Sequence, residues 1–229
     1  MGTKGRHPMT NSLDLAAQWH FPDTEVSTAA LRLLYEVSPQ FVANHTVRSY
    51  VFGRELAAAK GLRSGTDYDD ETVFLSSVLH DLGLTEYGGG DQRFEVDGAD
   101  AAARFLREHG VAEGKVTTIW QAIAVHTSLG LAHRFGPDHS VTHFGISLDI
   151  DGNEKGLLPP GFADRVHEAW PRHNLDYAIA DLIAHGIHVN ARKGPPFTFP
   201  AHVYHLRGGT QLTFLDVINN SGWGDQPTC

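Results

Sequence analysis

Apolar residues recur at helical spacing along most of this 229-residue chain, and this periodicity constrains the fold more than any other feature. No convincing pair of segments alternates between apolar and polar residues, as strands of a half-buried sheet would. The pattern therefore predicts an all-α fold, with one short candidate strand at residues 201–206. The expected helices cover residues 27–37, 40–60, 69–81, 97–108, 113–126, parts of 141–150, 162–170 and 175–191.

Several expected helix ends carry recognisable signals. Ser27 is predicted to cap the first helix, and Pro39 falls in the first turn of the second. Gly61 follows the second helix as an expected C-cap. Acidic residues at 69–71 suit the start of the third helix because its dipole favours negative charge there. A glycine-rich loop is expected at residues 86–94.

Length and composition predict an ordinary globular protein of one large domain or two small ones. Hydrophobic residues make up 41% of the chain and charged residues 20%, and 229 residues can bury a sizeable core. We expect a tail and lead-in at residues 1–24, a single helical bundle at 25–195, and a C-terminal extension at 196–229. The extension, which follows Gly194, is predicted to be irregular.

Charge and cysteine content exclude several kinds of function. A net charge of -9 argues against nucleic acid or an anionic membrane as a partner, because both attract clustered Lys and Arg. The only cysteine is Cys229, so the chain can form neither an internal disulfide nor a cysteine-based zinc site. Residues 1–10 lack a signal-peptide core and no apolar stretch is long enough to span a membrane. A cytoplasmic location is expected.

The dipeptide His80-Asp81 closes an apolar run at residues 73–79. Burying an imidazole beside a carboxylate costs free energy unless a partner satisfies both groups, and a divalent metal does this well. A chain this rich in histidine and aspartate contains such a dipeptide by chance, so a metal site needs further ligands on neighbouring helices.

Three further residues are candidates for that site. His45 is predicted to point inward, with Arg48 and Ser49 on the same helix face as its supporting partners. His126 ends the apolar run at 119–125, and Asp149 is flanked by aliphatic residues. Histidine and carboxylate ligands of this kind suit zinc, iron or manganese.

Each candidate also has a purely structural interpretation. A lone inward histidine, such as His45 or His126, is usually a hydrogen-bonded core residue. Asp149 is equally consistent with capping the loop at residues 151–153. The remaining histidines are predicted to lie on the surface or in loops, including His133, His139, His143, His185 and His188.

The order His45, His80-Asp81, Asp149 on an all-α chain resembles the HD-domain superfamily of metal-dependent hydrolases, over roughly residues 25–195. Local segments at 44–50, 79–85, 93–99 and 122–128 are similar to the cyanamide hydratase branch of that superfamily. The resemblance implies a single HD domain and a hydro-lyase that converts cyanamide to urea at a zinc ion. It also leaves a homo-oligomer open.

Many relatives with two metals carry an additional histidine shortly before the position of Phe94, and this chain has none there. One divalent metal per chain is therefore expected, zinc first and iron as the alternative. Basic residues near the expected site are few, Arg48 and Arg93 being the main ones, which weakens the case for a phosphate ester substrate.

The resemblance assigns the metal ligands to His45, His80, Asp81 and Asp149. The metal is expected to lower the pKa of bound water from about 15.7 towards about 7, giving a hydroxide that attacks a nitrile carbon. The predicted proton donors are His126, Glu95 and Thr127, and the candidate pocket walls, which equally suit the core, are Phe94, Phe144 and Trp120. Two alternatives stay open: a metal-dependent phosphohydrolase of nucleotides or other small phosphate esters, and a structural or regulatory metal site.

Overall fold

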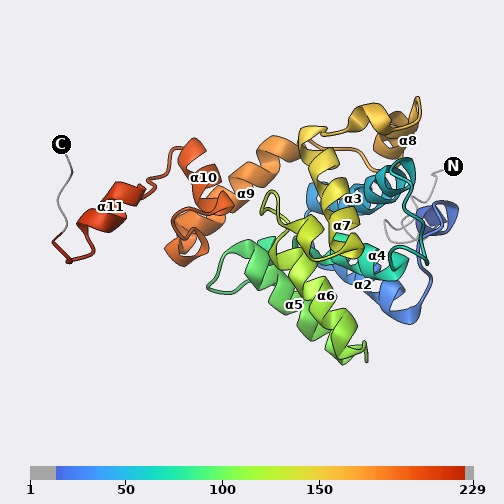
Figure 1. Ribbon diagram of the computed structural model, residues 1–229, viewed down its shortest axis with the longest axis horizontal. Coiled ribbons are helices and arrows are strands. Elements are labelled where there is room, and N and C mark those ends of the chain that lie inside the picture. The colour runs from blue at the N-terminus through green and yellow to red at the C-terminus, as the bar shows by residue number, and fades with distance from the viewer. Residues whose placement is uncertain (1–13, 225–229) are drawn as a thin grey trace, which may run out of the picture.

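The computed structural model describes residues 14–224 and confirms the all-α prediction: within this range the chain forms helices and no strand (Figure 1). Residues 1–13 of the predicted tail and residues 225–229, with Cys229, lie outside the described range. The helices are α2 (Glu25–Val37), α3 (Gln40–Ala59), α4 (Asp70–Leu79), η1 (Leu82–Leu84), α5 (Phe94–Glu108), α6 (Glu113–Ala124), η2 (Ala132–Arg134), α7 (Pro137–Asp151), η3 (Lys155–Leu157), α8 (Phe162–Ala169), α9 (Leu175–Val189), η4 (Ala191–Lys193), α10 (Phe199–Leu206) and α11 (Phe214–Asn219).

Capping side chains set several helix ends differently from the prediction. Helix α2 is capped by Thr24, whose hydroxyl accepts a hydrogen bond from the backbone N–H of Ser27, so the predicted cap lies inside the helix. Pro39 is itself the N-cap of α3. At the other end Lys60 is the C-cap, and Gly61 follows with a φ of 81°, in the left-handed region that glycine adopts freely.

Helices α3 and α7 make the most extensive contact between any two helices of the described chain. Glycine makes this close approach possible. A Cβ on Gly145 would lie 1.7 Å from the carbonyl oxygen of Ser49, and one on Gly53 would lie 2.6 Å from that of Val141. Because the two backbones meet there, the side chains of His45 on α3 and Asp149 on α7 come within hydrogen-bonding distance.

A single large core unites α2 to α8. Helix α4 is buried along nearly all its length, which explains why its sequence is an almost continuous apolar run. Helices α5 and α6 pack against each other, and α5 also packs on the short helix η1 that follows α4 (Figure 1). The end of α4 therefore lies among α3, α6 and α7, where a polar side chain is buried.

The prediction of an irregular C-terminal extension is wrong, because it contains α10 and α11. The candidate strand at residues 201–206 is wrong as well, since these residues belong to α10. The Thr198 hydroxyl caps that helix by accepting a hydrogen bond from the N–H of Ala201. Helix α10 packs against α9, and α11 lies farther out along the arm that α9 begins (Figure 1). None of the described helices combines the length and apolar character needed to cross a membrane.

Candidate metal centre

Three of the four predicted ligands converge where α3 meets the end of α4. His45 lies in the middle of α3, His80 is the C-cap residue of α4, and Asp81 begins the turn into η1. One potential ligand atom from each residue lies within 4.8 Å of those of the other two, and all three residues are buried. This group can hold a metal ion.

Hydrogen bonds orient both histidines with the same ring nitrogen toward the group. Nδ1 of His45 lies 2.7 Å from Oδ2 of Asp149, and Nδ1 of His80 lies 2.7 Å from the carbonyl oxygen of Ser77. A carbonyl or carboxylate oxygen only accepts, so each Nδ1 carries the hydrogen and each neutral ring has a bare Nε2. These two Nε2 atoms lie 3.3 Å apart.

The Asp81 carboxylate completes the group. Its Oδ2 lies 3.2 Å from Nε2 of His80 and 3.8 Å from Nε2 of His45, yet this buried oxygen has no hydrogen-bond partner. Burial raises the pKa of Asp81, but the neighbouring His80, with His45 and His126, holds it well below its usual range. Burial likewise disfavours charge on His80, but the Asp81 carboxylate raises the pKa of His80 above its ordinary value. A buried anionic oxygen facing bare imidazole nitrogens suits a divalent cation.

His126 lies beside this group, on the turn after α6, which ends at Ala124 and not at His126 as predicted. Its Nδ1 donates to the carbonyl oxygen of Ile123 over 2.6 Å, so its Nε2 is also bare. That Nε2 lies 3.9 Å from Oδ1 of Asp81. Burial and the adjacent His80 lower the pKa of His126 to about 4. A third unprotonated nitrogen thus faces the same carboxylate.

The structure does not bring Asp149, the fourth predicted ligand, into the group. Both of its oxygens bind elsewhere: Oδ1 accepts from Nε of Arg48 over 2.8 Å, and Oδ2 accepts from Nη2 of Arg48 and from Nδ1 of His45, both over 2.7 Å. Although burial raises the pKa of Asp149, the neighbouring His167 and the hydrogen bonds from His45 and Arg48 hold it well below its usual value. Asp149 therefore orients His45, with Arg48 behind it.

The two residues predicted to support His45 have different partners. Arg48 supports His45 through Asp149, and it also donates to the backbone carbonyl of Trp170 over 2.9 Å. Ser49 has no such role, since its hydroxyl donates to the backbone carbonyl of His45 over 2.9 Å. The helix spacing placed both residues correctly on one face, but it could not show what each side chain would meet.

Glu95, Thr127 and Arg93 form a connected set beside His126. Glu95 is fully buried, and its Oε1 accepts from Nη2 of Arg93 and from Oγ1 of Thr127, both over 2.5 Å. Nη2 of Arg93 also lies 3.1 Å from Oγ1 of Thr127. The Thr127 hydroxyl thus both donates and accepts within the set, whereas Oε2 of Glu95 has no partner.

A cavity of about 520 Å³ opens onto the candidate centre. Its buried end is formed by the three histidines and Asp81, and its remaining walls come mainly from α7, α9 and α10. No lysine or arginine lines it, while Asp151 and Asp176 do. The lining residues are His45, His80, Asp81, Phe94, His126, Thr127, Leu129, His143, Ile146, Ser147, Ile150, Asp151, Asp176, Ile179, Ala180, Ile183, Phe199 and Val203.

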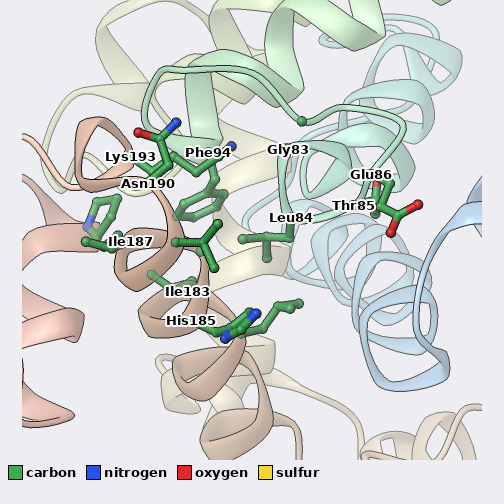
Figure 2. A pocket seen from close by; sticks show the side chains of 15 residues that line it. Gly83, Leu84, Thr85, Glu86, Phe94, Ile183, His185, Ile187, Asn190 and Lys193 are labelled. Carbon is green, nitrogen blue, oxygen red and sulfur yellow. The ribbon is translucent and has the colours of Figure 1, made fainter.

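A second cavity, of about 450 Å³, adjoins the first, because Phe94 and Ile183 line both. Figure 2 shows this second cavity. Ile187 and Lys193 line only this second cavity, and the Lys193 ammonium is paired with Asp97 over 2.8 Å. Of the three aromatic residues predicted as pocket walls, only Phe94 lines the cavity at the histidines. The other two pack against the main core, namely Trp120 and Phe144.

Two histidines that were predicted to lie on the surface or in loops are instead fully or partly buried on α7. His143 lines the first cavity, with Nδ1 3.1 Å from the carbonyl oxygen of His126, and His139 is buried on α7. His133, His185 and His188 are exposed, as predicted. The sequence contained a signal that His143 faces the cavity. The α7 residues that line it follow the i, i+3, i+4, i+7 pattern of one helix face, namely His143, Ile146, Ser147 and Ile150.

The centre combines a buried carboxylate oxygen without a partner and three histidines that direct a bare nitrogen toward Asp81. Such an arrangement can bind a divalent cation and can accept a proton close to it. No protein-family model matches this sequence, and no curated protein is significantly similar to it.

Proposed function

We propose that the protein is a metal-dependent hydratase that adds water to a small nitrile-like substrate, with cyanamide converted to urea. One observation carries this proposal. At the buried end of the cavity lie the bare Nε2 atoms of His45, His80 and His126, together with the unpartnered oxygen of Asp81. The cavity is lined by acidic and neutral residues and by no Lys or Arg. The resemblance to cyanamide hydratases, read from the residues around these same positions, supports it independently of the geometry.

His45, His80 and Asp81 would hold one divalent metal, zinc first and iron as the alternative. When bound, the metal supplies Lewis acidity and makes water a better nucleophile near neutral pH. Asp149 keeps Nδ1 of His45 protonated, so that Nε2 stays available as a ligand. The backbone carbonyl of Ser77 does the same for His80.

His126 is the residue best placed to move the proton. Its bare Nε2 accepts a proton from the attacking water as the carbon–oxygen bond forms and one carbon–nitrogen π bond breaks. The same Nε2–H then returns the proton to the nitrile nitrogen, which has gained the electron pair. Cyanamide and water thereby give the imidic acid, which tautomerises to urea. His126 thus begins the cycle as a proton acceptor and becomes a donor only afterwards.

Glu95 and Thr127 suit positioning better than proton donation. The only hydroxyl hydrogen of Thr127 is directed at Glu95, and Arg93 donates to the same hydroxyl oxygen. This set fixes the cavity wall next to His126. Thr127 lines the cavity, and a substrate amino group that donates to its hydroxyl oxygen would hold cyanamide by its amino end.

The cavity lining disfavours a phosphate ester. Phosphate sites are usually built with Arg or Lys, or with backbone N–H groups at a helix N-terminus. Here no Lys or Arg lines the cavity, and Asp151 and Asp176 add negative charge to it. A neutral substrate avoids the resulting repulsion.

The test is a urea assay with cyanamide on zinc-loaded protein, run beside phosphate release from a panel of nucleotides. We expect urea formation, its loss in His80→Ala, and a fall of about 10²- to 10⁴-fold in kcat for His126→Ala. His188→Ala, at an exposed position on α9, is the matched control and should retain activity. Phosphate release without urea would overturn the proposal, and so would full metal occupancy with neither product.

A further inference from the structure

The cavity is far larger than cyanamide requires. Cyanamide consists of one carbon and two nitrogens besides its hydrogens, whereas pockets of roughly 300–1,000 Å³ hold drug-sized ligands. At about 520 Å³, this cavity falls inside that range. The histidines and Asp81 occupy only its buried end, so most of its volume has no part in the chemistry proposed above.

Most of the apolar residues that line the rest of the cavity belong to three helices. Ile146 and Ile150 contribute from α7, and Ile179, Ala180 and Ile183 contribute from α9. Helix α10 adds Phe199 and Val203 from the C-terminal extension, for which no helix was predicted. An apolar group placed between these helices would leave water and gain free energy roughly in proportion to its buried area.

From this placement we infer that the natural substrate carries an uncharged apolar substituent of several carbons, which lies between α7, α9 and α10 while the nitrile-like carbon faces the histidines. This inference rests on the proposed function for its reactive end. An alkylcyanamide, R–NH–C≡N, is the simplest molecule of this class, and its hydration gives the corresponding alkylurea. A negatively charged substituent is disfavoured by Asp151 and Asp176.

The neighbouring cavity offers an internal control. Ile179 lines only the cavity at the histidines, and Ile187 lines only the second cavity (Figure 2). Both are isoleucines on α9, so truncating each to alanine removes the same atoms from the same helix. Only Ile179→Ala should alter the selectivity for the substituent.

The experiment compares zinc-loaded wild type, Ile179→Ala, Ile187→Ala and Ala180→Leu on cyanamide and its methyl, ethyl, propyl and butyl derivatives. In the wild type, kcat/KM should rise about three- to fourfold per methylene. Ile179→Ala should flatten this series, and Ile187→Ala should reproduce it. Ala180→Leu, which fills the apolar end, should lower the ratio of butyl to methyl kcat/KM at least tenfold. Thermal melting checks that each variant is folded.

A binding measurement separates failure of this inference from failure of the proposed function. The product ureas can be titrated calorimetrically, and butylurea should bind more tightly than methylurea, with the difference lost in Ala180→Leu. Hydration of cyanamide with no dependence on chain length in kcat/KM or in urea binding would overturn the inference alone. Tighter binding of butylurea without any hydration would overturn the proposed function, and of the inference only the site for an apolar substituent would stand. The inference would also be overturned if Ile187→Ala, and not Ile179→Ala, flattened the dependence of kcat/KM on chain length.

Discussion

Nε2 of His45 and Nε2 of His80 lie 3.3 Å apart, although neither carries a hydrogen in the neutral ring. A hydrogen bond at Nδ1 fixes the tautomer of each ring. The acceptor is the Asp149 carboxylate for His45 and the Ser77 carbonyl for His80. Two lone pairs directed at each other repel unless a cation lies between or beside them. This relationship suits the group to holding a cation, with Asp81 as its anionic member.

Replacing Asp149 should weaken metal binding without abolishing it, because Asp149 orients His45 and does not face the metal group. We expect Asp149→Asn to reduce zinc affinity about 10- to 100-fold, as for other residues that orient metal-binding histidines. Competition with a zinc chelator measures the change, and circular dichroism checks the fold. An unchanged affinity would show that the hydrogen bond to His45 is unimportant.

Removing the Arg48 side chain should cost more stability than removing any exposed arginine. Arg48→Met removes two of the N–H groups that donate to the buried Asp149 carboxylate, and breaking such a buried pair typically costs about 3–5 kcal/mol. Arg63→Met is the control, because Arg63 is exposed and solvent screens its pairing with Asp67. Urea denaturation measures both, and equal losses would contradict this account.

The contact between α3 and α7 should be intolerant of even one added carbon. A Cβ at residue 145 would overlap the Ser49 carbonyl oxygen, so Gly145→Ala should reduce the free energy of unfolding by about 3 kcal/mol or more. Gly114→Ala, in α6, meets nothing within 4 Å and should stabilise by about 0.5 kcal/mol. If both variants melted at the wild-type temperature, the helices could not approach as closely as described.

Lys115 should stabilise the protein at neutral pH but not in acid. Burial raises the pKa of Glu71, but bonds from Lys115, Thr24 and Ser27 lower it below its usual value. A lowered carboxyl pKa gives stability above the unfolded pKa that is lost as pH falls through the folded pKa. Lys115→Met should thus cost about 0.5–1 kcal/mol at pH 7.

That deficit should shrink as the pH falls below about 4.3, where the unfolded glutamate takes up its proton. Denaturation at several pH values follows the change. Arg192→Met serves as the control, since Arg192 and its partner Asp91 are both largely exposed. A deficit that stays constant down to pH 3 would show that Lys115 acts by packing alone.

Helical periodicity predicted most of the bundle because its helices bury one face against a common core. It failed at α10 and α11, which are too short for a period to be read. Val203 and Tyr204 favour a strand by composition, whereas the Thr198 cap and packing against α9 stabilise a helix. Since α10 forms part of the cavity wall, missing it also hid the size of the cavity.

The candidate ligands were found because a polar group at the end of an apolar run must be satisfied. His45, His80 and Asp81 are brought together as predicted, but the position of Asp149 was not readable. Its partner Arg48 lies 101 residues earlier, and only the contact between α3 and α7 brings them together. Sequence pattern gives the face of a helix, while the pairing of faces depends on the whole fold.

Zinc titration of metal-free protein tests the central claim most directly. The account predicts one equivalent of zinc per chain for the wild type and no tight binding for His80→Ala, while His188→Ala, at an exposed position, binds like the wild type. Calorimetry with elemental analysis of the dialysed protein gives the stoichiometry. Two tightly bound zinc ions per chain, or undiminished binding in His80→Ala, would contradict a single metal held by His45, His80 and Asp81.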